Sequence, residues 1–137
     1  MTDEAISLLK DFEGLRLKPY KDTVGKTSIG WGRNLDDVGI SHDEATAMLT
    51  HDIERATAQA RRFEWFDGLD AVRQDVVVMM VFNIGIGNFE KFKNLIRAIE
   101  SKEWNTAAYE LFNSLWAKQV QPSRVKAICD AMEHGQW

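Results

Sequence analysis

Residues 13–33 read EGLRLKPYKDTVGKTSIGWGR, and this stretch decides the fold. Side chains alternate between apolar and polar over residues 15–20, which is typical of an extended strand rather than a helix. Residues 23–29 predict a turn followed by a second short strand. Gly30 and Gly32 flank a tryptophan, and glycine at such positions permits a sharp bend or the close approach of another group. The stretch therefore predicts a small lobe of strands and tight turns.

On both sides of this stretch the sequence is patterned as helix. Thr2 precedes two acids and predicts the N-cap of a helix that runs to about Glu13. Ser41, followed three residues later by Glu44, matches a capping box, and the helix after it extends toward residue 62. Further apolar patterns predict helices over residues 89–99 and 104–115, and a last helix that Pro122 opens and Gly135 ends.

The most hydrophobic segment is VVVMMVF, residues 76–82. Its apolar side chains lie all round a helix, which predicts a central helix surrounded by others. The β-branched residues also fit a buried strand. The length of the apolar region and its helical flanks favour the helix.

Composition places the chain among ordinary globular proteins. It has 137 residues, 45% of them hydrophobic, and a net charge of −4, which argues against a nucleic-acid partner. The single cysteine, Cys129, can form no internal disulfide and fits a reducing cytosol. Because no signal peptide or membrane-spanning run is recognisable, we expect a soluble cytosolic chain without stable membrane insertion.

Two acids of the opening stretch are candidates for chemistry. Eight residues separate Glu13 from Asp22. Glycoside hydrolysis commonly uses such a pair: one carboxyl group protonates the leaving oxygen, and the other activates water or attacks the sugar. By itself the spacing is a weak indication, because two acids so placed are most often solvated charges. No metal site is predicted, since His42 and His51 lack the spacing of a zinc motif.

The surrounding residues strengthen this interpretation. The run EGLRLKPYKDTVGKTSIGWGRNL resembles the active-site segment of phage-type lysozymes, the endolysin muramidases of glycoside hydrolase family 24 typified by the T-even phage enzyme. The family pattern is a helix-end Glu, eight residues, an Asp, five residues and a Thr, followed by I-G-x-G. The run FDGLDAVRQDVVVMMVFNIG resembles the central helix of the family, and NLIRAIESKEWNTAAYELFNSLWAKQVQPSRVKAI resembles its C-terminal helices. The resemblance covers nearly the whole chain.

The resemblance implies an α+β fold that is mostly helical, with a small β-hairpin lobe and a helical lobe around a central buried helix. Residues 1–137 would form one catalytic domain. Its parts are a β-containing lobe at about 14–40, a connecting helix at about 42–62, and a helical lobe formed by residues 67–137 together with the N-terminal helix. The β-lobe should be trimmed, because the acidic loop from Asn34 to Ile40 is much shorter than in the T-even enzyme.

The resemblance also implies roles for three residues. Glu13 would be the general acid, and Asp22 would activate a water on the opposite face of the sugar. Ser28 stands where the family has the threonine that helps to position this water. Thr27 lies one residue earlier, but strand neighbours point to opposite faces, so the third role goes to Ser28.

Four further residues are candidate substrate contacts. Arg124 lies in a Q-x-x-P-x-R pattern, and the resemblance puts it close to the catalytic glutamate; otherwise it is a solvated helix arginine. Phe82 matches a residue that lines the sugar-binding cleft, and a plain core position is equally consistent. Trp31 either stacks on a sugar ring or packs within the protein. Asn34 replaces an apolar residue of the family.

At other positions the chain departs from the family. Two family substrate positions fall on Leu95 and Glu110, which changes their chemistry, so no role is transferred to them. Arg33 stands where the T-even enzyme has a histidine paired with an aspartate, and Asp52 matches that aspartate. We therefore expect an Arg33–Asp52 ion pair that ties the β-lobe to the connecting helix.

The function that the resemblance implies is hydrolysis of the β-1,4 bond between N-acetylmuramic acid and N-acetylglucosamine in bacterial peptidoglycan, with inversion and without a cofactor. The enzyme would be a monomeric phage or prophage endolysin that reaches the cell wall through a separate holin-type protein. A lytic transglycosylase is an alternative, but Asp22 argues against it. A non-catalytic peptidoglycan-binding module is another, which the serine at position 28 favours.

Overall fold

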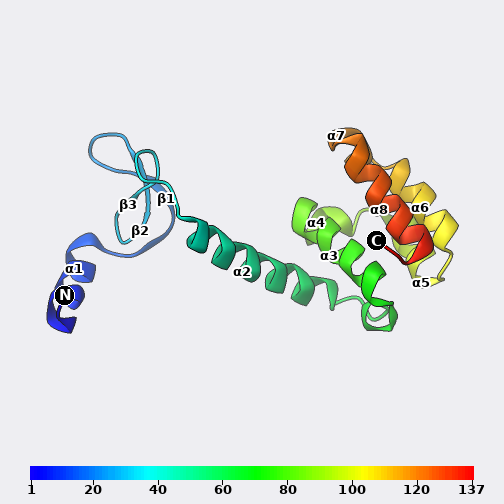
Figure 1. Cartoon of the computed structure of the whole chain (residues 1–137), viewed down its shortest axis with the longest axis horizontal. Coiled ribbons are helices and arrows are strands. Elements are labelled where there is room, and N and C mark those ends of the chain that lie inside the picture. Colours follow the sequence, from blue (N-terminus) through cyan, green and yellow to red (C-terminus); the bar gives the residue numbers. More distant parts are fainter. The chain divides into compact units, whose positions relative to one another are not determined.

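The computed structural model describes all residues, 1–137, and divides into two compact units, Met1–Met48 and Leu49–Trp137. Its elements are mostly helices, with one small antiparallel sheet (Figure 1). The predicted α+β, mostly helical fold is confirmed. No helix combines the length and the apolar character needed to cross a membrane.

The first unit contains helix α1 (Asp3–Glu13), three strands and the start of helix α2 (His42–Ala60). The strands are β1 (Arg16–Lys21), β2 (Thr27–Gly30) and β3 (Arg33–Asn34), paired antiparallel in the order β1-β2-β3. Asn34, which was expected to begin the acidic loop, is the last residue of β3, because a strand of two residues carries no alternation signal. Both predicted caps are present: the Thr2 side chain accepts from the Ala5 N–H at 3.2 Å, and the Ser41 side chain accepts from the Glu44 N–H at 3.1 Å.

The second unit is an all-helical body. It contains the end of α2, the short 3₁₀ helix η1 (Phe66–Gly68), and helices α3 (Ala71–Ile84), α4 (Ile86–Phe89), α5 (Lys93–Glu100), α6 (Trp104–Phe112), α7 (Leu115–Gln119) and α8 (Pro122–His134). Helix α8 packs against α6 and α3, and α6 also packs against α5 (Figure 1). The largest fully buried side chains are Phe66, Val76, Val77, Met80, Phe89, Ile99, Leu111, Ile128 and Met132.

The segment VVVMMVF is helical, as expected, and lies in α3. Its buried positions include Val77 and Met80, whereas Met79 and Phe82 remain about half exposed. The apolar surface of α3 is therefore covered on part of its circumference rather than all round.

Two of the predicted helices are each divided in the structure. The pattern over residues 89–99 is interrupted at Phe92, between α4 and α5. The pattern over residues 104–115 ends at Phe112. Ser114 then caps α7 by accepting from the Ala117 N–H at 3.2 Å. The apolar spacing continues through both breaks. Periodicity alone therefore predicts one continuous helix in each place where the structure has two.

Arg73 of α3 connects that helix to the end of α8. Its Nε donates to the Met132 carbonyl at 2.7 Å, and its Nη2 donates to the Glu133 carbonyl at 2.7 Å. The guanidinium also pairs with Asp70 at 3.0 Å and lies 4.0 Å from the centroid of the Trp104 ring. It thereby satisfies carbonyl groups that the end of a helix leaves without partners.

Candidate active site

Glu13 is the last residue of α1, and its side chain is exposed. Gly14 ends the helix with a φ of 70°, and its N–H donates to the Lys10 carbonyl at 2.9 Å. A positive φ is easily adopted only by glycine, so the helix stops directly after the acid. The local sequence thus places a carboxyl group at the C-terminal end of a helix, next to the sheet of the same unit.

The β2–β3 turn contacts the last turn of α1. Gly30 and Gly32, with φ values of 70° and 79°, place Trp31 at its tip. The Lys10 ammonium lies 4.8 Å from the centroid of the Trp31 ring, and the Glu13 carboxyl group lies against Gly32. Trp31 is 48% exposed, so it is neither buried in a core nor fully free. The turn therefore determines the surroundings of Glu13.

Asp22 begins the turn between β1 and β2, and hydrogen bonds hold its carboxylate in place. Oδ1 accepts from the backbone N–H of Val24 at 3.0 Å and of Lys26 at 2.8 Å. The Asp22 N–H also donates to the Lys26 carbonyl at 2.8 Å, which extends the strand ladder into the turn. Because one oxygen holds the turn, the carboxylate is already oriented before any ligand binds.

Ser28 is 2% exposed, and it is the only buried residue of the first unit. It faces Tyr20 of β1 and Asn34 of β3 across the sheet. Side chains alternate along a strand and Asp22 follows Tyr20 by two residues, so Asp22 and Ser28 share one face. Thr27 points to the other face, where its hydroxyl accepts from the Lys21 ammonium at 2.7 Å. Of the two neighbouring hydroxyls, the one that shares a face with Asp22 is that of Ser28.

The acidic loop after β3 forms hydrogen bonds within itself and to β2. Asn34 Oδ1 accepts from the Asp37 N–H at 3.0 Å, and Asn34 Nδ2 donates to the Asp37 carboxylate at 2.9 Å. Asp36 accepts from the Thr27 N–H at 2.8 Å. The candidate substrate residue Asn34 therefore uses its amide to shape the loop.

The expected Arg33–Asp52 ion pair is wrong. Arg33 instead donates both Nη groups to Glu44, at 2.6 and 3.1 Å. Asp52 pairs with Arg55, one turn along α2. Glu44 lies at the start of α2, and Asp52 lies eight residues or about 12 Å further along the axis. The hydrogen bonds from Arg33 lower the pKa of the Glu44 carboxyl group.

The other two candidates lie in the second unit. Phe82 is 46% exposed and lines a cavity of about 360 Å³ with residues of α2 and with Gly85 and Ile86. Phe82 is thus not a fully buried residue of the core. Arg124 is an exposed residue in the first turn of α8.

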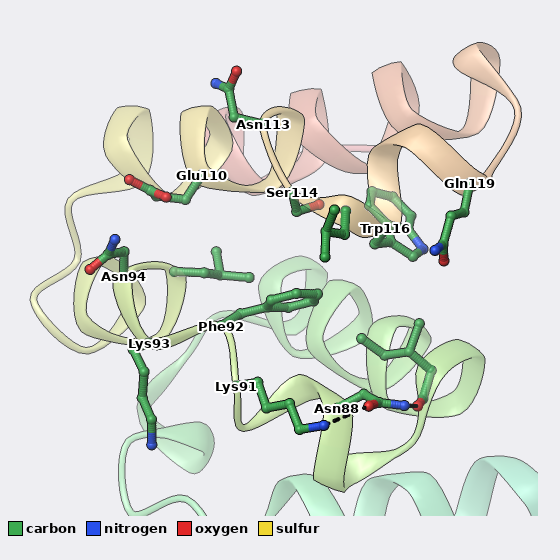
Figure 2. A pocket seen from close by; sticks show the side chains of 13 residues that line it. Asn88, Lys91, Phe92, Lys93, Asn94, Glu110, Asn113, Ser114, Trp116 and Gln119 are labelled. Carbon is green, nitrogen blue, oxygen red and sulfur yellow. Dashed lines mark hydrogen bonds between the residues drawn. The ribbon is translucent and has the colours of Figure 1, made fainter.

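A larger cavity, of about 630 Å³, is also found in the second unit (Figure 2). Leu95 and Glu110, to which no role was transferred, both line it. Its wall includes the buried Trp116, whose indole N–H donates to Asn83 Oδ1 at 2.8 Å. Amide and lysine side chains also line it: Asn88, Lys91, Lys93, Asn94, Asn113 and Gln119. Sequence reasoning missed this cavity, because its residues come from five helices and the segments between them and share no periodicity.

Comparison with known proteins decides the family. The sequence profile of the phage lysozyme family, described as "Phage lysozyme", matches residues 10–130. The chain belongs to the phage lysozyme family. It is 29% identical to the protein named "Probable T4-type lysozyme 1" of Dictyostelium discoideum, over 98% of this chain and 96% of that protein. It is 30% identical to the "Endolysin" of Acyrthosiphon pisum secondary endosymbiont phage 1, over 86% of this chain and 80% of that protein.

In this phage lysozyme, the three proposed catalytic residues all belong to the first unit. Glu13 ends α1, Asp22 begins a hairpin turn, and Ser28 lies on β2. Trp31 and Asn34 belong to the same unit, whereas Phe82 and Arg124 belong to the second. No group of three or more His, Cys, Asp and Glu side chains is placed to hold a metal ion. As a member of a lysozyme family the chain is a glycosidase.

Proposed function

We propose that this phage lysozyme hydrolyses the β-1,4 bond between N-acetylmuramic acid and N-acetylglucosamine in bacterial peptidoglycan, and so lyses the host cell as an endolysin. One observation carries the proposal: two carboxyl groups from different elements, a helix end and a hairpin turn, belong to one small unit whose sheet also holds a buried serine. The endolysin names of phage relatives support the wall as the substrate.

The two acids have different surroundings, which supports different roles. Asp22 accepts two backbone hydrogen bonds through Oδ1, which hold its carboxyl group in the turn where it would activate water. Glu13 accepts none of the hydrogen bonds formed in the protein and is exposed, so its carboxyl group is available to protonate a leaving oxygen. Ser28 shares the face of Asp22 and would help to orient the water. An inverting reaction of this kind predicts a separation of roughly 6.5–9.5 Å between the two carboxyl groups.

Four residues are proposed substrate contacts. Trp31 offers a half-exposed ring for stacking on a sugar, and Phe82 lines a cavity. Arg124 and Asn34 are proposed through the family resemblance, and a sugar contact by the Asn34 amide would have to coexist with its bonds to Asp37. Alanine at each position should raise KM more than it lowers kcat, because these contacts form in both the ground state and the transition state.

Muropeptide analysis of purified peptidoglycan tests the reaction. The wild type should release products with reducing muramic ends, and Glu13→Gln should release them at least 100-fold more slowly, because the general acid is lost. Glu4→Gln, the same change at the exposed start of α1, is the matched control and should remain active. Anhydro-muramic ends would identify a transglycosylase instead. Binding without any cleavage would identify a wall-binding module.

We further propose that the enzyme acts as a monomer in a single catalytic domain, and that a holin-type protein gives it access to the wall. Sedimentation of the purified chain at several concentrations tests the first statement. Expression in a bacterial host with and without a membrane-permeabilising protein tests the last, because lysis should require both proteins.

A further inference from the structure

The Glu13 carboxyl group lies against a glycine that has no room for a side chain. A Cβ at Gly32 would lie 2.5 Å from Glu13 Oε2 and 3.3 Å from the carboxyl carbon. Of the nine glycines only Gly135 is similarly crowded, in its case by the Arg73 guanidinium. The absence of a side chain at Gly32 therefore defines a surface that the acid contacts directly.

The neighbouring contact fixes the same turn to the same helix. Trp31 lies beneath the Lys10 ammonium, and Gly32 lies beside Glu13. Lys10 and Glu13 are three residues apart and so lie on one face of α1. The turn thus contacts two successive side chains of this face.

We propose that Gly32 is a positioning residue, whose bare Cα is the surface against which the Glu13 carboxyl group rests when it protonates the leaving oxygen. The inference rests on the proposed function of Glu13. A methyl group at this position would push the carboxyl oxygen away by about 0.9 Å, the difference between an ordinary contact of 3.4 Å and the 2.5 Å available. A displacement of about 1 Å can reduce a reaction rate about 100-fold.

Gly30 provides a matched control. It lies on the other side of Trp31 and has nearly the same φ, 70° against 79°, but no atom lies within 4 Å of its Cβ direction. Alanine at either position introduces a similar backbone strain, because both glycines have a positive φ. The clash at Gly32 involves the end of a flexible, exposed side chain that can swing aside. Gly32→Ala and Gly30→Ala should therefore lower Tm to a similar extent.

Steady-state kinetics separates the two variants. We expect Gly32→Ala to lower kcat about 100-fold with little change in KM, because the acid acts in the transition state. Gly30→Ala should keep most of the wild-type kcat. Equal losses of kcat in the two variants would overturn the inference, since backbone strain alone would then explain both.

A second measurement is independent of catalysis. The ¹³C resonance of the Glu13 side-chain carboxyl group, assigned by its loss in Glu13→Gln, should shift in Gly32→Ala and stay in place in Gly30→Ala. If the wild type cleaves no peptidoglycan, the proposed function fails, and the resonance still decides whether Gly32 positions Glu13; an unchanged resonance rejects it. If Gly32→Ala does not fold although Gly30→Ala does, adding Glu13→Ala to Gly32→Ala should restore folding, and continued failure rejects the contact.

Discussion

Asp22 carries two tasks that substitutions can separate. Its Oδ1 holds the β1–β2 turn through the N–H groups of Val24 and Lys26, and its charge is proposed to activate water. Asp22→Asn keeps an amide oxygen at the same place but removes the charge. Asp22→Ala removes both. The two variants should therefore share a loss of activity but differ in stability.

The stability difference follows from the two hydrogen bonds. The bond from Lys26 is partly buried and that from Val24 is exposed, so alanine leaves one N–H poorly hydrated and returns the other to water. Leaving a buried donor without a partner costs about 1–3 kcal/mol, and the exposed bond adds little, so we expect about 1–3 kcal/mol for Asp22→Ala. For Asp22→Asn we expect about 0.5–1 kcal/mol, because a charged acceptor makes a bond roughly twice as strong as a neutral one.

Two assays on the same preparations decide the matter. Urea unfolding measures the free-energy difference, and release of reducing ends from peptidoglycan measures activity. Both variants should lose about 10²–10⁴-fold in activity, the range for a general base. An asparagine variant as unstable as the alanine variant would show that Oδ1 does not hold the turn. An asparagine variant with wild-type activity would show that the charge takes no part in the reaction.

Three other predictions follow from contacts described above. Arg73→Met should lower the free energy of unfolding by about 2–4 kcal/mol, because it removes two charged bonds to α8 carbonyls and the contact with Trp104; urea unfolding beside the exposed Arg97→Met control measures this. Glu44 has a lowered pKa because Arg33 donates to it, so its stabilising contribution is present above the ordinary value of 4.5 and is lost as the pH falls through the lower folded value. As the pH is lowered, the free energy of unfolding should therefore fall less for Glu44→Gln than for the wild type. Parallel plots of this free energy against pH would contradict the prediction. Burial, with the nearby Asp130 and Glu133, raises the pKa of the Cys129 thiol to about 11, so at pH 8 iodoacetamide should modify Cys129 only after unfolding, as mass spectrometry would show.

Much of the fold could be predicted because its signals are local. Thr2, Ser41 and Pro122 mark helix starts through hydrogen bonding or a fixed φ, and each does so in the structure. The break before α7 was missed although Ser114 carries the same kind of signal. At Ser114 the apolar spacing continues past the cap. Periodicity therefore predicted one helix through this residue, whereas the cap starts a new one.

In the site, too, the features that depend on local sequence could be predicted, and those that depend on tertiary contacts could not. Glu13 at a helix end and Asp22 at a turn could be predicted from glycine placement and the family pattern. The contact between Gly32 and Glu13 could not, because it depends on how a turn approaches a helix in three dimensions. The Arg33 partner was predicted wrongly because an ion pair was transferred by position, whereas a glutamate two helical turns closer was available. Long side chains select partners by reach, which sequence alignment does not record.

The register of the hairpin has a consequence for preparations of this enzyme. Thr27 holds β2 in place through Lys21 and Asp36, and this register puts Ser28 on the Asp22 face. A slip by one residue would exchange the faces of the two hydroxyl residues and leave a hydroxyl at nearly the same depth. Such a chain would keep its helices and its solubility but lack a competent site. The active fraction of a preparation, counted by burst titration or inhibitor stoichiometry, can therefore be smaller than the folded fraction seen by circular dichroism.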